Sequence, residues 1–164
     1  MSNFENSQKG KFLAGLQKIS LDDKENNLTI RCKFNFSYFE KQDASQNFCD
    51  WSPEQLHKLL EKIKIYSSES LEHWTRQAIG GSGSVLAIYR DFPKKSDFSI
   101  PKHIPHQAWW GRFRLESAVR LIGFIIPDEY SGRAHPITKE LFDRNTFYVT
   151  HLDKDHRFYK TEKK

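Results

Sequence analysis

The clearest hydrophobic pattern in the chain is a strict alternation over positions 28–38. Apolar or aromatic side chains stand at every second position: Leu28, Ile30, Cys32, Phe34, Phe36 and Tyr38. Polar residues fill the positions between them, and Arg31 and Lys33 are among these. Side chains of a strand point alternately to its two faces, so this pattern predicts a half-buried antiparallel strand.

Helical spacing follows after a polar stretch. Ser52 is the expected N-cap, Pro53 takes the first helical position, and Gln55 completes a capping box. Leucine and isoleucine then recur at positions 56, 59, 60 and 63, which places them on one face. The pattern predicts an amphipathic helix that ends near Tyr66.

A second helix is expected to begin at Ser68 and to stop at the pair Gly80-Gly81, which resembles a C-terminal glycine cap. Leu71 and Trp74 share its apolar face. The run GGSGS that starts at Gly80 lacks the spacing of the known phosphate-binding glycine motifs. We therefore interpret it as a flexible connector.

The C-terminal half contains four more apolar runs that predict strands. They are Val85–Arg90, Trp109–Leu115, Val119–Ile126 and Thr146–Leu152. The short link at 116–118 predicts a hairpin, and the last strand is expected to pair with the one before it. Long polar segments separate these runs at 91–106 and 127–144, the latter with one helical turn expected around Thr138–Phe142. A strand, two helices and then antiparallel strands predict an α+β fold, with an antiparallel sheet and a helix pair packed on one face.

Length and composition favour one domain over 28–164, preceded by a polar and partly helical N-terminal arm over 1–27. Hydrophobic residues make up 37% of the chain and aromatic residues 14%, so an aromatic-rich core is expected. No apolar run reaches the length of a membrane span, and the N-terminus lacks the apolar core of a secretory signal. Neither cysteine belongs to a CxxC pair. We expect a cytoplasmic protein with no membrane partner.

The formal net charge of +5 and the pI near 9.1 favour acidic partners, nucleic acid first. Basic and aromatic side chains gather in the C-terminal half: Arg112, Arg114, Arg120, His156, Arg157 and Tyr159. Guanidinium groups suit phosphate, and a histidine transfers protons near neutral pH. Such groups serve a metal-independent ribonuclease, which must deprotonate a 2′-hydroxyl, stabilise the charged phosphorane and protonate the leaving oxygen. The alternative is that the arginines are solvated and His156 caps a turn.

On the ribonuclease hypothesis, each group of the cluster has an expected role. The predicted catalytic residues are Arg114, Arg120, His156 and Tyr159, and the predicted nucleic-acid contacts are Arg112, Arg157, Lys154 and Trp109. Trp109 and Trp110 offer a base-stacking platform, but we favour Trp110 as a core residue and Trp109 as the cover of a sheet edge.

A metal site is the second chemical hypothesis. His151, Asp153, Asp155 and His156 lie close together, and His103 with His106 forms an HxxH pair. No HExxH motif, cysteine pair or EF-hand spacing accompanies them, so a turn with Asx-type hydrogen bonding is the simpler interpretation. We predict neither a metal nor another cofactor.

Two motifs carry a resemblance to a known family. The hairpin R-F-R-L-E-S-A-V-R-L-I-G-F and the ending D-H-R-F-Y resemble small bacterial RelE/ParE-type toxins over about 109–159. That resemblance implies an antiparallel sheet preceded by a helix pair, messenger-RNA cleavage on the ribosome or gyrase inhibition, and an antitoxin partner. The chain is also similar to bacterial proteins that end in RLIGF…FYV…LDKDH-x-FY, which implies no activity. The alternative function is a non-enzymatic binding module for protein or nucleic acid, in phage defence or as the partner of a toxin.

Overall fold

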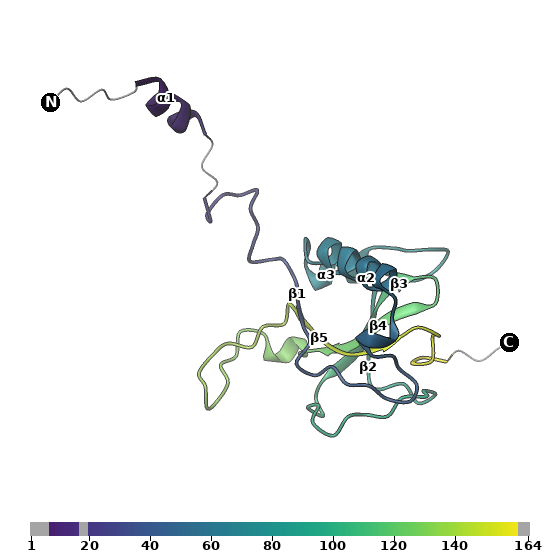
Figure 1. The fold of residues 1–164 in the computed structure, drawn as a ribbon. Coiled ribbons are helices and arrows are strands. Elements are labelled where there is room, and N and C mark those ends of the chain that lie inside the picture. The colour runs from purple at the N-terminus through teal and green to yellow at the C-terminus, as the bar shows by residue number, and fades with distance from the viewer. Residues whose placement is uncertain (1–6, 17–19, 161–164) are drawn as a thin grey trace.

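A five-stranded mixed sheet forms the centre of the computed structural model, which describes residues 7–16 and 20–160 (Figure 1). In chain order the elements are α1 (Ser7–Gly15), β1 (Lys33–Asn35), a 3-10 turn (Phe48–Asp50), α2 (Pro53–Tyr66), α3 (Leu71–Arg76), β2 (Leu86–Arg90), β3 (Trp109–Glu116), β4 (Val119–Ile125), a 3-10 turn (Asp128–Tyr130) and β5 (Thr146–Asp153). The strand order is β1-β5-β4-β3-β2. Helices segregated from a largely antiparallel sheet confirm the α+β class.

The alternating segment at 28–38 gives a shorter strand than its pattern predicts, and its neighbour is parallel. Only Lys33–Asn35 joins the sheet, beside β5 in parallel register. Upstream, the Cys32 amide donates to the Glu69 carbonyl, so this part of the chain bonds to the helix connection instead of a strand. Burial still alternates from Cys32 onward, whereas Leu28 is 45% exposed. The alternation of apolar and polar residues correctly predicted which face is buried from Cys32 onward. It did not predict which strand the segment pairs with.

The first predicted helix is confirmed in its details. The Ser52 side chain accepts from the Gln55 amide at 3.2 Å, and the Gln55 side chain accepts from the Ser52 amide at 2.9 Å. Pro53 opens α2 and Tyr66 ends it. These reciprocal bonds satisfy amides that the first helical turn leaves without partners.

The second helix is shorter than expected. Ser70, not Ser68, caps α3, and the helix ends at Arg76. Gln77 is extended, and its carbonyl accepts from the Val85 amide, so the chain turns into the sheet before it reaches Gly80. The buried positions Leu71 and Trp74 are as predicted.

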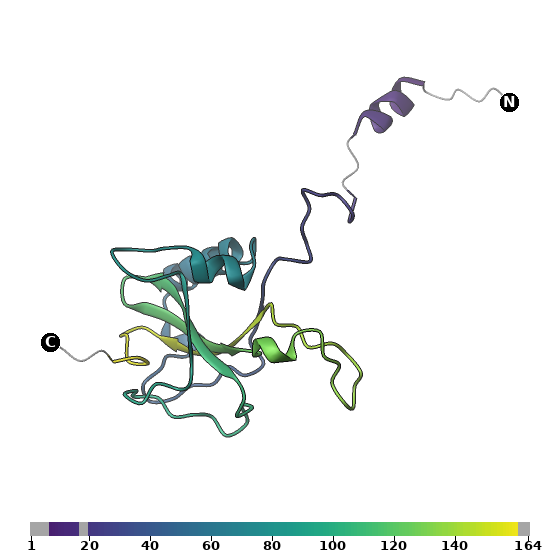
Figure 2. The ribbon, with the colours of Figure 1, turned by 180° about the vertical axis from the view of Figure 1, so that it is seen from behind.

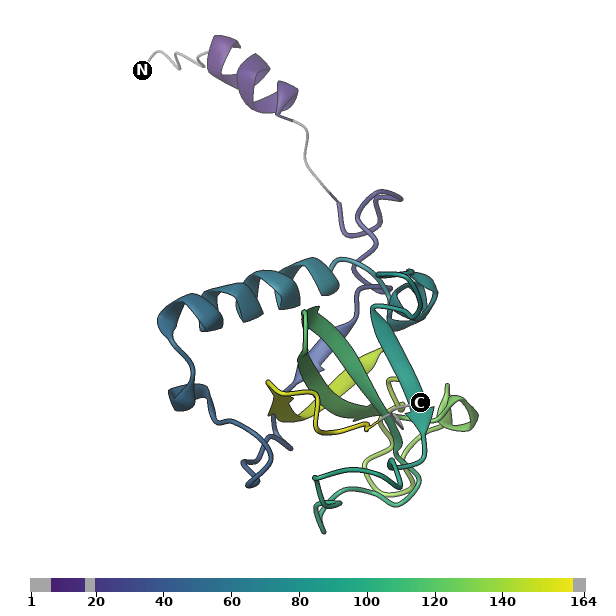
Figure 3. The same cartoon turned by 90° about the vertical axis from the view of Figure 1, so that its right-hand side faces the viewer.

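The two helices cover one face of the sheet (Figures 1 and 3). Beneath them lies an aromatic-rich core in which Phe113 and Phe147 have no exposed surface. The Tyr66 ring stacks on Phe113, with a centroid separation of 5.0 Å, and its hydroxyl donates to the Arg114 carbonyl. This bond ties the end of α2 to β3.

Two segments without regular structure cover the opposite face. The long loop at 91–108 and the chain after β5 can be followed in Figure 2. Residues from both segments contribute to a second cluster of buried side chains. Its members include Phe98, Ile104, Trp110, Phe124 and Phe158. The loop is therefore a layer of the fold, and Trp110, 4% exposed, is the core residue that we expected.

The segment between β4 and β5 projects from the sheet (Figure 2). The helical turn predicted around Thr138–Phe142 is wrong, because Lys139 has a positive φ of 66° and the helical geometry falls at Asp128–Tyr130 instead. An isolated bridge between Ala134 and Leu141 makes the projection hairpin-like. At the other end of the chain, α1 lies in the predicted arm, of which positions 1–6 and 17–19 lie outside the described residues. None of the described helices has the length and apolar character needed to cross a membrane.

Candidate functional site

Three arginines share the sheet face that the helices leave uncovered. Arg112 and Arg114 alternate with Phe113, which points into the helix-side core. The antiparallel register places Arg120 of β4 directly opposite Arg114 of β3. Like charges at facing positions destabilise a sheet. The pairing of Arg114 with Arg120 therefore concentrates positive charge on the sheet and lowers the stability of the fold.

These arginines bond to neutral oxygens. Arg112 Nε donates to the Tyr89 hydroxyl at 3.1 Å, and Arg114 Nη1 donates to the Ile79 carbonyl at 3.3 Å. Arg120 Nη1 donates to the Ser117 carbonyl at 2.6 Å. Over residues 7–16 and 20–160, no ion pair joins any of the three to a carboxylate. Asp153, which faces Arg120 across the β4–β5 pairing, is a nearby negative charge that does not form an ion pair with it.

Arg120 is the most constrained of the three. It is 6% exposed, and its Nε has no partner among the described residues. Burial, together with Arg112 and Arg114, lowers its pKa to about 10. Arg120 is buried and donates to carbonyls of the β3–β4 hairpin. It therefore adds positive potential to the surface but does not itself contact a ligand there.

His156 lies beside this positive charge. It follows β5 in a turn where its φ of 57° is unusual for a residue with a side chain. Burial, and then the nearby Arg120, lower its pKa below the ordinary histidine value. The imidazole is therefore neutral at pH 7 and able to accept a proton.

Asp153 builds the turn that carries His156. Its carboxylate is 1% exposed and accepts from the Arg157 amide at 2.9 Å and the Phe158 amide at 2.8 Å. The expected Asx-type turn is thus confirmed. Asp153 also faces Arg120 in the β4–β5 register and favours the charged form of that arginine.

Tyr159 lies near Arg112 because it stacks on Tyr89, a residue that the sequence analysis did not single out. Its ring is 41% exposed and stacks on Tyr89 at 4.8 Å, and the Tyr89 hydroxyl accepts from Arg112. Tyr89 carried no signal of its own beyond its place in a short strand. We call Arg112, Arg114, Arg120, His156 and Tyr159 the arginine–histidine cluster.

The glycine-rich run also belongs beside this cluster. Gly80 has a φ of 70°, and a Cβ at that position would lie 3.2 Å from Arg114 Nη1. The Ser84 carbonyl accepts from Arg112 at 3.4 Å. The two ends of the run GGSGS thus contact the arginines, while its three middle residues are exposed.

The remaining predicted contacts lie elsewhere. Arg157 pairs with Asp97 at 2.9 Å, and Lys160 shares that carboxylate. Lys154 lines a small hollow against α2. Trp109 is on the helix-covered face, under the guanidinium of Arg90 at 4.5 Å. The structure brings none of these three to the arginine–histidine cluster.

The residues of the metal hypothesis have other partners. His151 has no exposed surface, and its Nδ1 lies 2.9 Å from the Glu40 carbonyl. His103 stacks on Tyr38 at 5.6 Å. In the described part of the chain, no group of three or more metal-ligating side chains is arranged to hold an ion.

Buried His151 predicts acid sensitivity. Burial lowers its pKa, against the smaller opposing effects of Glu40 and Asp153, and the pKa of His156 is lowered as well. A histidine with a depressed folded-state pKa stabilises the protein above its unfolded pKa of about 6.5, and this contribution is lost as pH falls.

Between pH 7.5 and 5.5 the unfolding temperature should fall by about 3 °C or more. The fall should be smaller in His151→Gln and unchanged in His57→Gln, which alters an exposed histidine. Equal slopes in all three proteins would contradict this assignment.

Comparison of the chain with protein-family models, with curated proteins and with solved structures finds no match. The class of protein is therefore inferred from the fold and the cluster alone.

Proposed function

We propose that this protein is an RNA-directed toxin-type protein that acts as a metal-independent endoribonuclease. The observation that carries the proposal is the convergence of three arginines without ion-pair partners and one neutral histidine on one sheet face. A helix pair that precedes a run of antiparallel strands also fits what the RelE/ParE resemblance implies.

The arginines match the charge that develops during RNA cleavage. Arg112 and Arg114 are half-buried on the sheet surface, so their guanidinium groups can bind phosphate oxygens, and Arg120 strengthens the field from below. An anionic ligand would offset the mutual repulsion of the three cations.

His156 and Tyr159 supply the proton transfers. Neutral His156 takes the proton from the 2′-hydroxyl while the 2′-oxygen forms a bond to phosphorus. The bond from phosphorus to the 5′-oxygen breaks, and that oxygen takes a proton from the Tyr159 hydroxyl. The products are a 2′,3′-cyclic phosphate and a 5′-hydroxyl end, and a proton passes from His156 through solvent to Tyr159 to restore both groups.

Cleavage of RNA in the presence of EDTA tests the proposal. We expect His156→Ala to lower the cleavage rate by about 100-fold or more, because general base catalysis contributes at least that much. Arg114→Ala should lower it by about 10- to 100-fold through lost phosphate stabilisation. The product ends should be cyclic phosphate and 5′-hydroxyl.

Two matched variants serve as controls. His57→Ala removes an exposed histidine on α2, and Arg133→Ala removes an arginine that stacks on Tyr130 in the projecting segment. Both should keep wild-type rates. Equal rates in all five proteins, or no cleavage by the wild type, would remove the ribonuclease assignment.

The projecting segment supports the second candidate, a protein-binding module. Ile137 is 83% exposed and Leu141 is 67% exposed, beside an apolar hollow of about 360 Å³ that Tyr130 and Phe142 help to line. Exposed apolar groups of this kind mark interaction surfaces. Salt-insensitive association with a protein, without RNA cleavage or growth arrest on expression, would favour this function, whereas RNA binding should weaken steeply with salt.

A further inference from the structure

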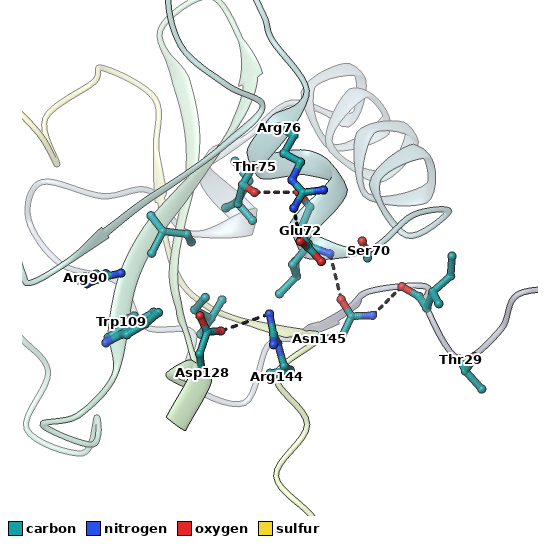
Figure 4. A pocket seen from close by; sticks show the side chains of 15 residues that line it. Thr29, Ser70, Glu72, Thr75, Arg76, Arg90, Trp109, Asp128, Arg144 and Asn145 are labelled. Carbon is teal, nitrogen blue, oxygen red and sulfur yellow. Dashed lines mark hydrogen bonds and ion pairs between the residues drawn. The ribbon is translucent and has the colours of Figure 1, made fainter. Parts of the chain in front are cut away.

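A cavity of about 680 Å³ opens on the helix-covered face of the sheet (Figure 4). One of its walls is α3, which contributes Leu71, Glu72, Thr75 and Arg76. Its floor is apolar and comes from three adjacent strands: Leu86 and Ile88 of β2, Trp109 of β3 and Ile125 of β4. Cavities of about 300–1,000 Å³ with an apolar lining hold small ligands in other proteins.

Arg90 is aimed at this cavity by an irregular backbone. The β2–β3 register shifts between Ile88 and Arg90, and Arg90 has a φ of 65°. The guanidinium lies over the Trp109 ring, 4.5 Å from its centroid. Bulges and positive φ values at residues other than glycine recur next to functional sites, where they redirect a side chain.

The charges around the cavity are unevenly compensated. Arg76 pairs with Glu72 at the α3 wall, and Arg144 pairs with Asp128 at 3.3 Å on the far wall. Within the described ranges Arg90 has no such pair. Figure 4 shows the two ion pairs on separate walls and Arg90 with Trp109 on a third side. The cavity thus combines one uncompensated cation with carboxylates on opposite walls.

We propose that this cavity binds a nucleoside 5′-phosphate. The base would lie on the apolar floor beside Trp109, and Arg90 would bind the phosphate, since a guanidinium binds phosphate oxygens in pairs. The carboxylates of Glu72 and Asp128 can accept from ribose hydroxyl or base amino groups. This site lies on the opposite sheet face from the arginine–histidine cluster, so it does not depend on the ribonuclease proposal.

Calorimetric titration of the full chain with the four common nucleoside monophosphates tests the proposal. At least one should bind about tenfold more tightly than both inorganic phosphate and its own nucleoside. Arg90→Gln should weaken that binding about tenfold, and Trp109→Leu should do the same. Arg133→Ala is the matched arginine control, because Arg133 is exposed on the projecting segment and does not line the cavity, and it should leave binding within about twofold. Arg90 is exposed, so Arg90→Gln should fold normally, which circular dichroism would verify.

A parallel titration with a 5′-phosphorylated trinucleotide tests whether the site takes a free nucleotide or the 5′ end of an RNA. Tighter binding of the trinucleotide indicates the end of an RNA, and tighter binding of the mononucleotide indicates a free nucleotide. Binding of phosphate as tight as that of every nucleotide would overturn the proposal, as would the absence of binding. Binding lost in Arg133→Ala but kept in Arg90→Gln would overturn it too.

Discussion

Replacement of Gly123 by alanine is expected to lower the free energy of unfolding by about 3 kcal/mol or more. A Cβ at this position would lie 2.2 Å from the Tyr148 carbonyl oxygen and 2.7 Å from the Phe147 ring. Both neighbours belong to β5, which pairs with β4 at this point. The backbone oxygen cannot rotate away as a side chain does, so β4 and β5 must separate and lose hydrogen bonds. Urea unfolding followed by circular dichroism would measure the loss.

Gly81→Ala provides the control for this prediction. No atom lies within 4 Å of a Cβ built at Gly81, and its backbone is not in the left-handed region. The change should therefore alter stability by less than about 0.5 kcal/mol. A Gly123→Ala protein with the stability of Gly81→Ala would show that the β4–β5 spacing is not as close as described.

Replacement of Asp153 by asparagine is expected to cost about 3 kcal/mol of stability, a large effect for so small a change. The carboxylate accepts from the amides of Arg157 and Phe158 with its two oxygens, and asparagine has only one acceptor oxygen. One buried amide would lose its partner, and Arg120 would lose a nearby negative charge. The turn that carries His156 should loosen, and the loss should be visible in urea unfolding and in faster proteolysis after residue 153.

Asp155→Asn is the matched control, because Asp155 is an exposed carboxylate in the same turn. It should leave both stability and proteolysis close to those of the wild type. If both asparagine variants behaved alike, the turn would owe its stability to general charge and not to the two bonds of Asp153.

The sequence predicted most reliably those elements whose signals are local. The capping box at Ser52 fixed the start of α2, and the short link at 116–118 predicted the hairpin, because neighbours in the chain satisfy both. The strand at 28–38 was predicted too long and with the wrong neighbour direction. Its partner β5 lies more than 100 residues away, and the alternation carries no information about such a distant pairing.

In the candidate site, too, the features with local signals were predicted from the sequence and those that depend on distant contacts were not. Alternation within β3 was enough to place Arg112 and Arg114 on one face, and pairing of the hairpin strands added Arg120. The roles of Tyr89 and of the run after Gly80 depend on contacts with residues far along the chain, so no local pattern indicated them. The same limit applies to the cavity beside α3, because its lining combines that helix with strand residues and with Arg144 and Asn145, which are far apart in the sequence.

The place of β5 in the sheet has a consequence for synthesis of the protein. This strand is made after the other four, yet it lies between β1 and β4 and contributes Phe147, Val149 and Leu152 to the helix-side core. A nascent chain that has reached only Ile125 has its helices and hairpin but lacks the strand that joins them. Folding of the sheet must therefore wait until Asp153 has left the ribosome exit tunnel, and the unfinished polypeptide exposes apolar surface that chaperones recognise.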